Sequence, residues 1–117
     1  MTKSMTPCDA GSVVLVRFPF TDLSSTKKRP ALVVSPLSFS QRFGDVVVMP
    51  LTSQGQQEAD LALSKWQAAG LPKQTWIKPL IGTLSQGIVD RQIGKLDPSD
   101  YRCVRAAVAL LLAKNCV

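Results

Sequence analysis

The chain has 117 residues, of which 45% are hydrophobic and 19% are charged, the composition of an ordinary folded protein. Fourteen Lys and Arg residues against eight Asp and Glu residues give a net charge of +6. This excess favours a polyanionic partner: nucleic acid, an acidic protein, or both. No histidine is present, which excludes His-based acid–base catalysis and Ser–His or Cys–His pairs.

The cysteines and the hydropathy pattern exclude further classes. Cys8, Cys103 and Cys116 are odd in number and show no CxxC spacing, so we expect no disulfide framework and no zinc site. We also expect no cofactor. A cytoplasmic location fits this cysteine usage best. No apolar stretch follows Lys3 as it would in a signal peptide, and the apolar run from Val104 to Ala113 is too short to span a bilayer. We therefore expect no membrane partner.

The first half of the chain contains three apolar runs rich in β-branched residues. They predict strands at Val13 to Phe18, Ala31 to Ser35 and Val46 to Leu51. The polar stretch Thr21 to Lys28 predicts a surface loop between the first two strands. Leu37 to Gly44 is expected to be a connector.

The second half begins with shorter strand signals, at Leu61 to Leu63, Thr75 to Lys78 and Leu80 to Leu84. The sequence then changes period. Asp97 followed by Pro98 is a helix-start signature, with the aspartate as N-cap and the proline at the first helical position.

Apolar residues at spacings of three and four predict a C-terminal helix over residues 98–114, with one apolar face made of Tyr101, Val104, Val108, Leu111 and Leu112. Several short strands followed by one helix predict a mainly β fold, a small curled antiparallel sheet closed by that helix. We expect one domain over residues 1–117, with residues 1–9 as a flexible leader.

The stretch most suggestive of chemistry begins at Arg29. Pro30 holds Arg29 in extended geometry at the start of a buried strand, which fixes a permanently charged guanidinium on a rigid edge. Thr52 and Ser53 end the next strand. If these two strands pair antiparallel, the start of one lies beside the end of the other. A forked cation and two hydroxyls then converge on one point, which suits a phosphate.

Such a site fits metal-free RNA cleavage, in which the 2′-hydroxyl of the RNA attacks the adjacent phosphorus. Arg29 suits stabilisation of the pentacoordinate phosphorane, and Thr52 or Ser53 could orient the phosphate. Asp22 is the one carboxylate of the adjoining loop and the candidate general base. An aspartate that bonds its own backbone in a turn explains Asp22 equally well.

Further residues are candidates for RNA binding. Lys27, Lys28 and Ser24 lie in or after the loop that leads to Arg29. Aromatic side chains beside cations stack the bases of single strands, and we expect Phe20 and Trp66 to do so. The other charged residues of the second half are read as solvated surface: Arg91, Lys95, Arg102 and Arg105.

Over nearly its whole length the chain resembles the PemK/MazF family of type II toxin–antitoxin ribonucleases. The resemblance rests on these elements: Gly11-Ser12-Val13-Val14, Phe18-Pro19-Phe20-Thr21-Asp22, Lys28-Arg29-Pro30-Ala31-Leu32-Val33-Val34-Ser35, Leu51-Thr52-Ser53-Gln54, Ala69-Gly70-Leu71 and Ile93-Gly94-Lys95-Leu96. It implies an SH3-like barrel with a terminal helix, a homodimer, and metal-independent cleavage of single-stranded RNA to a 2′,3′-cyclic phosphate and a 5′-hydroxyl.

By motif, the resemblance makes Arg29 the main catalytic residue and Thr52 its phosphate-binding partner, with Ser53 adjacent. It also implies a cognate antitoxin with an acidic segment. The chain departs from the family pattern at two places. Ser24 and Ser25 stand in the region where many members carry an acid before the motif arginine, and Gly82 stands where many carry a base.

Three hypotheses follow. The first is an endoribonuclease toxin, and the second is a catalytically weak relative that binds RNA or an antitoxin without cutting. The third is an SH3-like protein-interaction module. The basic charge balance argues against the third.

Overall fold

The computed structural model describes residues 7–17, 28–54 and 61–113. Its elements in chain order are β1 (Ser12–Val16), β2 (Arg29–Val33), α1 (Leu37–Phe43), β3 (Asp45–Thr52), β4 (Trp76–Ile77), β5 (Gly82–Ser85), the 3-10 helix η2 (Gln86–Ile88), β6 (Val89–Lys95) and α2 (Pro98–Ala113). No helix among these residues is long and apolar enough to cross a membrane.

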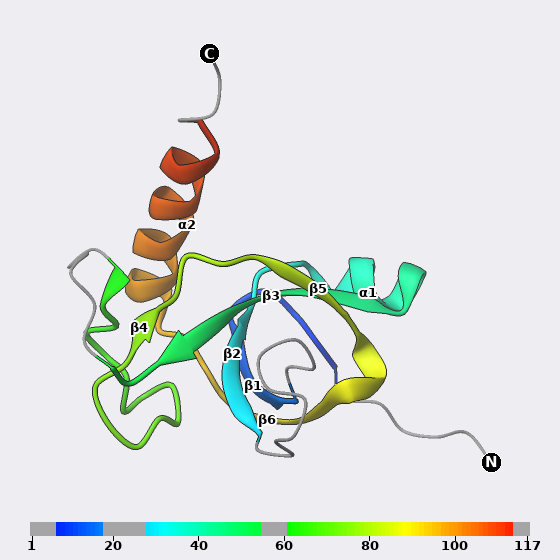
Figure 1. The fold of residues 1–117 in the computed structure, drawn as a ribbon, viewed down its shortest axis with the longest axis horizontal. Coiled ribbons are helices and arrows are strands. Elements are labelled where there is room, and N and C mark those ends of the chain that lie inside the picture. Colours follow the sequence, from blue (N-terminus) through cyan, green and yellow to red (C-terminus); the bar gives the residue numbers. More distant parts are fainter. Residues whose placement is uncertain (1–6, 18–27, 55–60, 114–117) are drawn as a thin grey trace.

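The strands form one antiparallel sheet with the order β4-β3-β2-β1-β6, and β5 pairs with the first half of β3. The sheet curls so that its strands follow one another around a ring, with α2 at one side (Figure 1). Among the described strands, no pairing joins β6 to β4 or β5, so the barrel is not closed by hydrogen bonds. The predicted fold, a mainly antiparallel sheet with a C-terminal helix, is confirmed.

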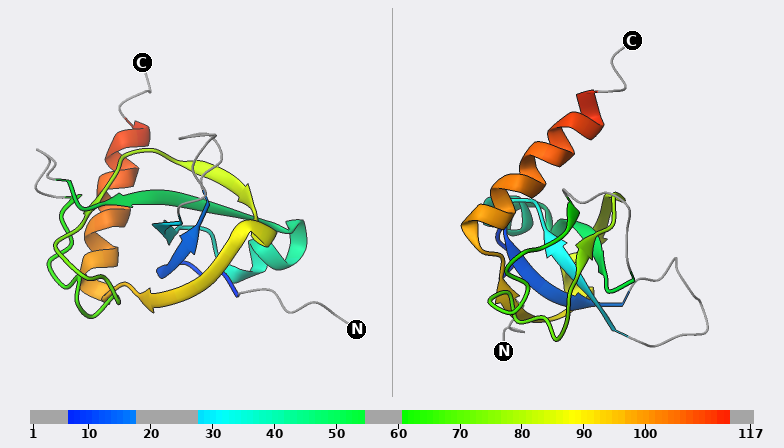
Figure 2. Two further views of the ribbon diagram at one scale, coloured as in Figure 1. Left: turned by 60° about the horizontal axis from the view of Figure 1, so that its bottom comes forward. Right: turned by 90° about the vertical axis from the view of Figure 1, so that its left-hand side faces the viewer.

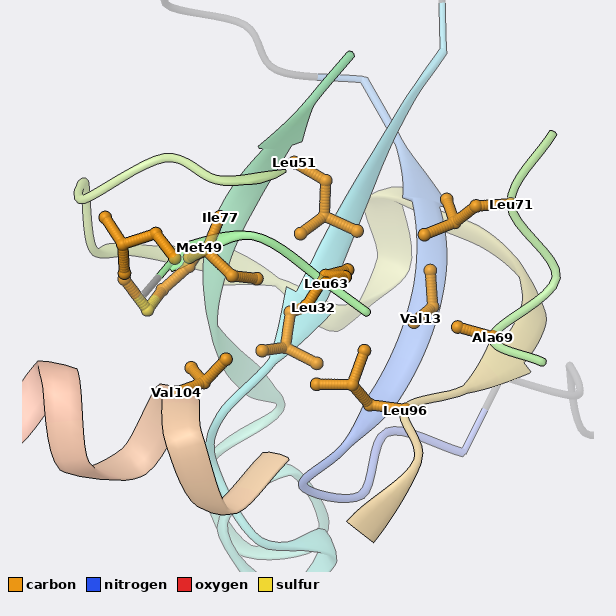
Figure 3. Packing of buried hydrophobic residues seen from close by; sticks show 11 residues of the cluster. Val13, Leu32, Met49, Leu51, Leu63, Ala69, Leu71, Ile77, Leu96 and Val104 are labelled. Atoms are coloured by element: carbon orange, nitrogen blue, oxygen red, sulfur yellow. The ribbon is translucent and has the colours of Figure 1, made fainter. Parts of the chain in front are cut away.

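Both faces of the central strands are buried, which explains their nearly continuous apolar sequences. Alternate residues of a strand point to opposite faces. Val13, Leu32 and Met49 belong to one core cluster, which also takes in Val104 of α2 (Figure 3). The second cluster lies on the other face of these strands and consists of Cys8, Val14, Val16, Ala31, Val33, Val46, Val48, Leu84 and Val89.

The predicted start of α2 is confirmed. The Ser99 N–H donates to Asp97 Oδ2 at 3.0 Å, the Ser99 hydroxyl donates to the same oxygen, and the Tyr101 N–H donates to the Asp97 carbonyl at 2.9 Å. The Ser99 hydroxyl, followed by its backbone N–H, lowers the pKa of Asp97 because both bonds favour the charged carboxylate.

The apolar face predicted for α2 packs against the core as far as Val108. Val104 lies in the core with Tyr101 and Val108 packed against it, whereas Leu112 of the same predicted face is 57% exposed. The reason is visible in Figure 2, where the second half of α2 extends past the sheet. Leu110, at 63% exposure, also lies on this projecting half.

The expected connector at Leu37 to Gly44 joins β2 to β3 and contains a short helix, α1, that was not predicted. Gly44 ends this helix at φ 72°, and its N–H donates to the Ser40 carbonyl at 2.8 Å. The expected strand at Leu61 to Leu63 was wrong. That segment contributes one isolated bridge, between Ala62 and Trp76.

Two other parts of the chain are more ordered than expected. No strand was predicted after Leu84, yet β6 pairs along β1. In β6 only Val89 is buried, so its sequence lacks the apolar pattern that marks a strand. Of the expected flexible leader 1–9, residues 1–6 lie outside the described part of the chain. Cys8 is buried in the core, and Asp9 Oδ1 accepts a hydrogen bond from the Leu37 N–H at 3.0 Å.

The segment 64–75 has no regular structure and is held at two points. Asp100, at the start of α2 and 5% exposed, accepts hydrogen bonds from the Ser64 N–H (3.2 Å), the Ser64 hydroxyl (2.8 Å) and the Lys65 N–H (2.8 Å). Further along, Gly70 lies so close to β6 that a Cβ there would be 2.3 Å from the Ile93 carbonyl oxygen. The segment is therefore fixed against both α2 and β6.

Replacing Asp100 with alanine is expected to destabilise the protein by about 2–4 kcal/mol, because two backbone N–H groups lose a charged, buried acceptor. Urea unfolding measures this loss. The matched control is Asp90→Ala, since the contacts of Asp90 with Lys28 and Arg91 lie at the surface and are expected to be worth about 1 kcal/mol or less. Equal losses in the two variants would contradict this role of Asp100.

Candidate functional site

The candidate site is organised by the pairing of β2 with β3. These strands are antiparallel, with Ala31 opposite Pro50 and Leu32 opposite Met49. Continuing the same register by two residues sets Arg29 opposite Thr52. The antiparallel pairing on which the predicted site depended is confirmed.

At this end of the hairpin lies a cavity of about 380 Å³. One side comes from the β2–β3 hairpin and consists of Lys28, Arg29, Pro30, Leu51, Thr52, Ser53 and Gln54. We call this the hairpin side. The loop side comes from the segment that precedes β4 and consists of Leu71, Pro72, Lys73 and Thr75. The cavity thus combines three cations with hydroxyls and apolar side chains.

Arg29 is the first residue of β2 and stands exposed beside the cavity. Its backbone is fixed from both sides, because it pairs with Val16 of β1 and precedes Pro30. Within the described residues it has no carboxylate partner, whereas Lys28 Nζ lies 3.0 Å from Asp90 Oδ1. Arg29 therefore keeps its charge available to an anion in the cavity.

Thr52, half-buried at the end of β3, is oriented by its neighbour. Its Oγ1 accepts a hydrogen bond from the Gln54 N–H at 3.1 Å. A hydroxyl that accepts in this way still has its own proton to donate. Thr52 can thus donate to an anion beside Arg29, and Ser53, which is exposed, adds a second hydroxyl.

The structure does not place every predicted site residue. Asp22, Ser24, Phe20 and Lys27 lie outside the described residues. Trp66 was expected to stack bases, but it is half-buried against the core and does not line the cavity. The placement of Trp66 follows from the segment 64–75, whose anchoring packs this ring inward.

The loop side was missed by the sequence analysis. The Thr75 hydroxyl donates to the Lys73 carbonyl at 2.8 Å, and Thr75 itself is buried. The Leu63 N–H donates to the Thr75 carbonyl at 3.0 Å, and Gln74 Nε2 donates to the Leu63 carbonyl at 2.9 Å. These bonds fix the backbone from which Lys73 projects. No local sequence pattern marks Lys73, because distant contacts bring its segment to the hairpin.

The chemistry of this arrangement is that of an anion site. Guanidinium and ammonium groups beside hydroxyl donors bind phosphate and stabilise negative charge that develops on its oxygens. Among the described residues, no three His, Cys, Asp or Glu side chains gather as they would around a metal ion. Fold and site together define a small curled antiparallel β protein with a terminal helix and a cationic cavity at one end of its central hairpin.

Comparison with known proteins gives the family. The model of the PemK-like, MazF-like toxins of type II toxin–antitoxin systems matches residues 9–112. The chain belongs to this family, and the resemblance noted from the sequence is confirmed. No curated protein matches the chain in sequence.

Solved structures show the same fold. MazE-MazF from Deinococcus radiodurans aligns with a TM-score of 0.75 at 22% identity, covering 92% of this chain and 97% of that one. An endoribonuclease in complex with its cognate antitoxin, from a mycobacterial species, gives 0.70 at 19% identity and covers 93% and 96%. The Mycobacterium tuberculosis toxin MazF-mt6 gives 0.72 at 17% identity and covers 87% and 96%.

Proposed function

We propose that the chain is a toxin that acts as an endoribonuclease on single-stranded RNA without a metal ion. The observation that carries the proposal is the meeting of Arg29 and Thr52 at one cavity, in a chain of a toxin family. The net charge of +6 is suited to a polyanionic substrate.

The reaction proposed for this site transfers phosphorus within the RNA. The 2′-oxygen attacks the adjacent phosphorus while its proton passes to a base, for which Asp22 is the candidate. Negative charge grows on the non-bridging oxygens, where Arg29 and the Thr52 hydroxyl stabilise it. The bond from phosphorus to the 5′-oxygen breaks and that oxygen takes up a proton. The products are a 2′,3′-cyclic phosphate and a 5′-hydroxyl.

A second function remains a candidate, in which the protein binds RNA or an antitoxin without cutting. It is favoured by the serine at position 24 and by Gly82, which stand where the family pattern has charged residues. Gly82 pairs with Val48 in the middle of β3 and does not line the cavity. The family pattern therefore fits this chain best at Arg29 and Thr52.

Two partners belong to the proposal, an acidic cognate antitoxin and a second copy of the chain. The antitoxin is supported by the family and by the excess of cations. A homodimer is supported by the exposed apolar residues Leu80, Ile81, Leu110 and Leu112, which a partner could cover. We propose one domain over residues 1–117 that carries all these functions.

Incubation with labelled single-stranded RNA in excess EDTA tests the proposal. We expect cleavage to continue unchanged in EDTA and to leave 2′,3′-cyclic phosphate ends, which acid hydrolysis converts to monophosphates. Cleavage that stops in EDTA would contradict the metal-free reaction. RNA that is retained but not cut would favour the binding function.

A further inference from the structure

The loop side of the cavity contains a cation that the proposed reaction does not use. Lys73 lines the same cavity as Arg29 but comes from the segment before β4, on the other side from the hairpin. Apolar side chains from both segments also line the cavity, among them Leu51 and Pro72. The cavity therefore has positive charge from two separate segments and apolar surface in the same lining.

Lys73 is built into the fold rather than carried on a free loop. The Thr75 hydroxyl holds its carbonyl, Gln74 bonds back to Leu63, and Gly70 lies against the backbone of β6. A side chain on a fixed backbone loses less entropy on binding than one on a flexible loop. The place of the Lys73 backbone beside the cavity is thus fixed before any ligand binds.

The charge of Lys73 is uncompensated in the described part of the chain. The three ion pairs there join Lys28 to Asp90, Lys65 to Asp97 and Arg91 to Asp90. Among the described residues, the cavity therefore offers two cations that no carboxylate pairs with, Arg29 from the hairpin side and Lys73 from the loop side. A group with a single negative charge neutralises one of these two cations. A second negative group is needed to neutralise the other.

We propose that Lys73 forms a subsite for a second RNA phosphate, next to the one that is cleaved. A nucleic acid strand carries one negative charge per nucleotide, so a nucleotide that fills the cavity has a phosphate at each end. One phosphate lies at Arg29 and Thr52, and the other lies at Lys73. The sugar and base between them contact the apolar residues. This subsite rests on the proposed function and names how the same cavity holds its substrate.

The test measures binding of a labelled single-stranded RNA of randomised sequence with 2′-fluoro ribose, which lacks the attacking hydroxyl and is not cut. Lys73→Ala is expected to raise Kd about tenfold and to reduce the slope of log Kd against log salt by about 0.7, the value for one phosphate contact on a single strand. Lys78→Ala is the matched control. It removes the same charge from an exposed position five residues on that does not line the cavity.

A second measurement separates phosphate binding from a structural role. Once the cut site is mapped with ordinary RNA, an uncharged methylphosphonate is placed at each phosphate beside it. At one of these positions the modification is expected to weaken RNA binding to the parent protein and to change RNA binding to Lys73→Ala very little. Lys73→Arg, which keeps the charge, is expected to restore most of the affinity.

The outcomes distinguish this subsite from the function on which it rests. A parent protein that neither binds nor cuts RNA overturns the proposed function and the subsite with it. A parent that binds RNA while Lys73→Ala and Lys78→Ala behave alike overturns the subsite alone. The subsite alone is also overturned if the methylphosphonate weakens RNA binding to Lys73→Ala as strongly as it weakens binding to the parent.

Discussion

Replacing Arg29 with alanine is expected to reduce RNA cleavage at least about a thousandfold. On the hairpin side, Arg29 is the cation that has no carboxylate partner among the described residues, since Lys28 pairs with Asp90, and it lies opposite Thr52 in the strand register. The charge it meets is greatest in the transition state, so the loss should fall on kcat more than on KM. Single-turnover cleavage of labelled RNA measures it.

The fold is expected to survive this change, because the Arg29 side chain is exposed and the backbone pairing with Val16 remains. Its unfolding free energy should stay within about 0.5 kcal/mol of the parent. Arg102→Ala is the control, since it removes the same charge from the exposed surface of α2 and should leave the rate nearly unchanged. A rate that falls equally in both variants would show that total charge, and not Arg29, matters.

Replacing Gly94 with alanine is expected to have the largest effect on stability, a loss of about 3 kcal/mol or more. A Cβ at position 94 would lie 2.0 Å from the carbonyl oxygen of Ala69, and backbone cannot give way as the end of a flexible side chain can. The segment 64–75 would have to move away from β6. Thermal and urea unfolding measure the loss.

Gly44→Ala is the control for Gly94→Ala, because it adds the same methyl group at another glycine. No atom lies within 4 Å of the added Cβ at position 44, although φ there is positive at +72°. This variant should lose about 1–2 kcal/mol from backbone strain alone. If Gly94→Ala costs no more than this, the close approach of the two segments has been overestimated.

The parts of the fold that could be predicted from the sequence are those where local signals agree with burial. β1, β2 and β3 are buried on both faces, so their β-branched runs indicate strands without ambiguity. Asp97 and Pro98 likewise mark the start of α2 through their own chemistry. β6 could not be recognised, because a largely exposed strand owes its existence to its partner β1 and not to its own apolar residues.

The same distinction divides the candidate site. Arg29 and Thr52 could be brought together from the sequence because an antiparallel pair of neighbouring strands has one simple geometry. Lys73 could not, because its segment reaches the cavity through contacts with Gly94 and Asp100, far along the chain. The projecting half of α2 was missed because helical periodicity does not tell how far the sheet extends beneath it.

The anchoring of the segment 64–75 has a consequence for the order in which the site is completed during synthesis. Strands β2 and β3 are complete once Thr52 has been made, so a nascent chain can form the half of the cavity that contains Arg29 and Thr52 first. The other half waits for Gly94 and Asp100, which leave the ribosome some twenty to thirty residues after Lys73. A ribosome-bound chain that ends before β6 therefore has Arg29 but not the assembled cavity. Under the proposed function, such a chain would not cut the RNA that encodes it until β6 and the start of α2 have emerged.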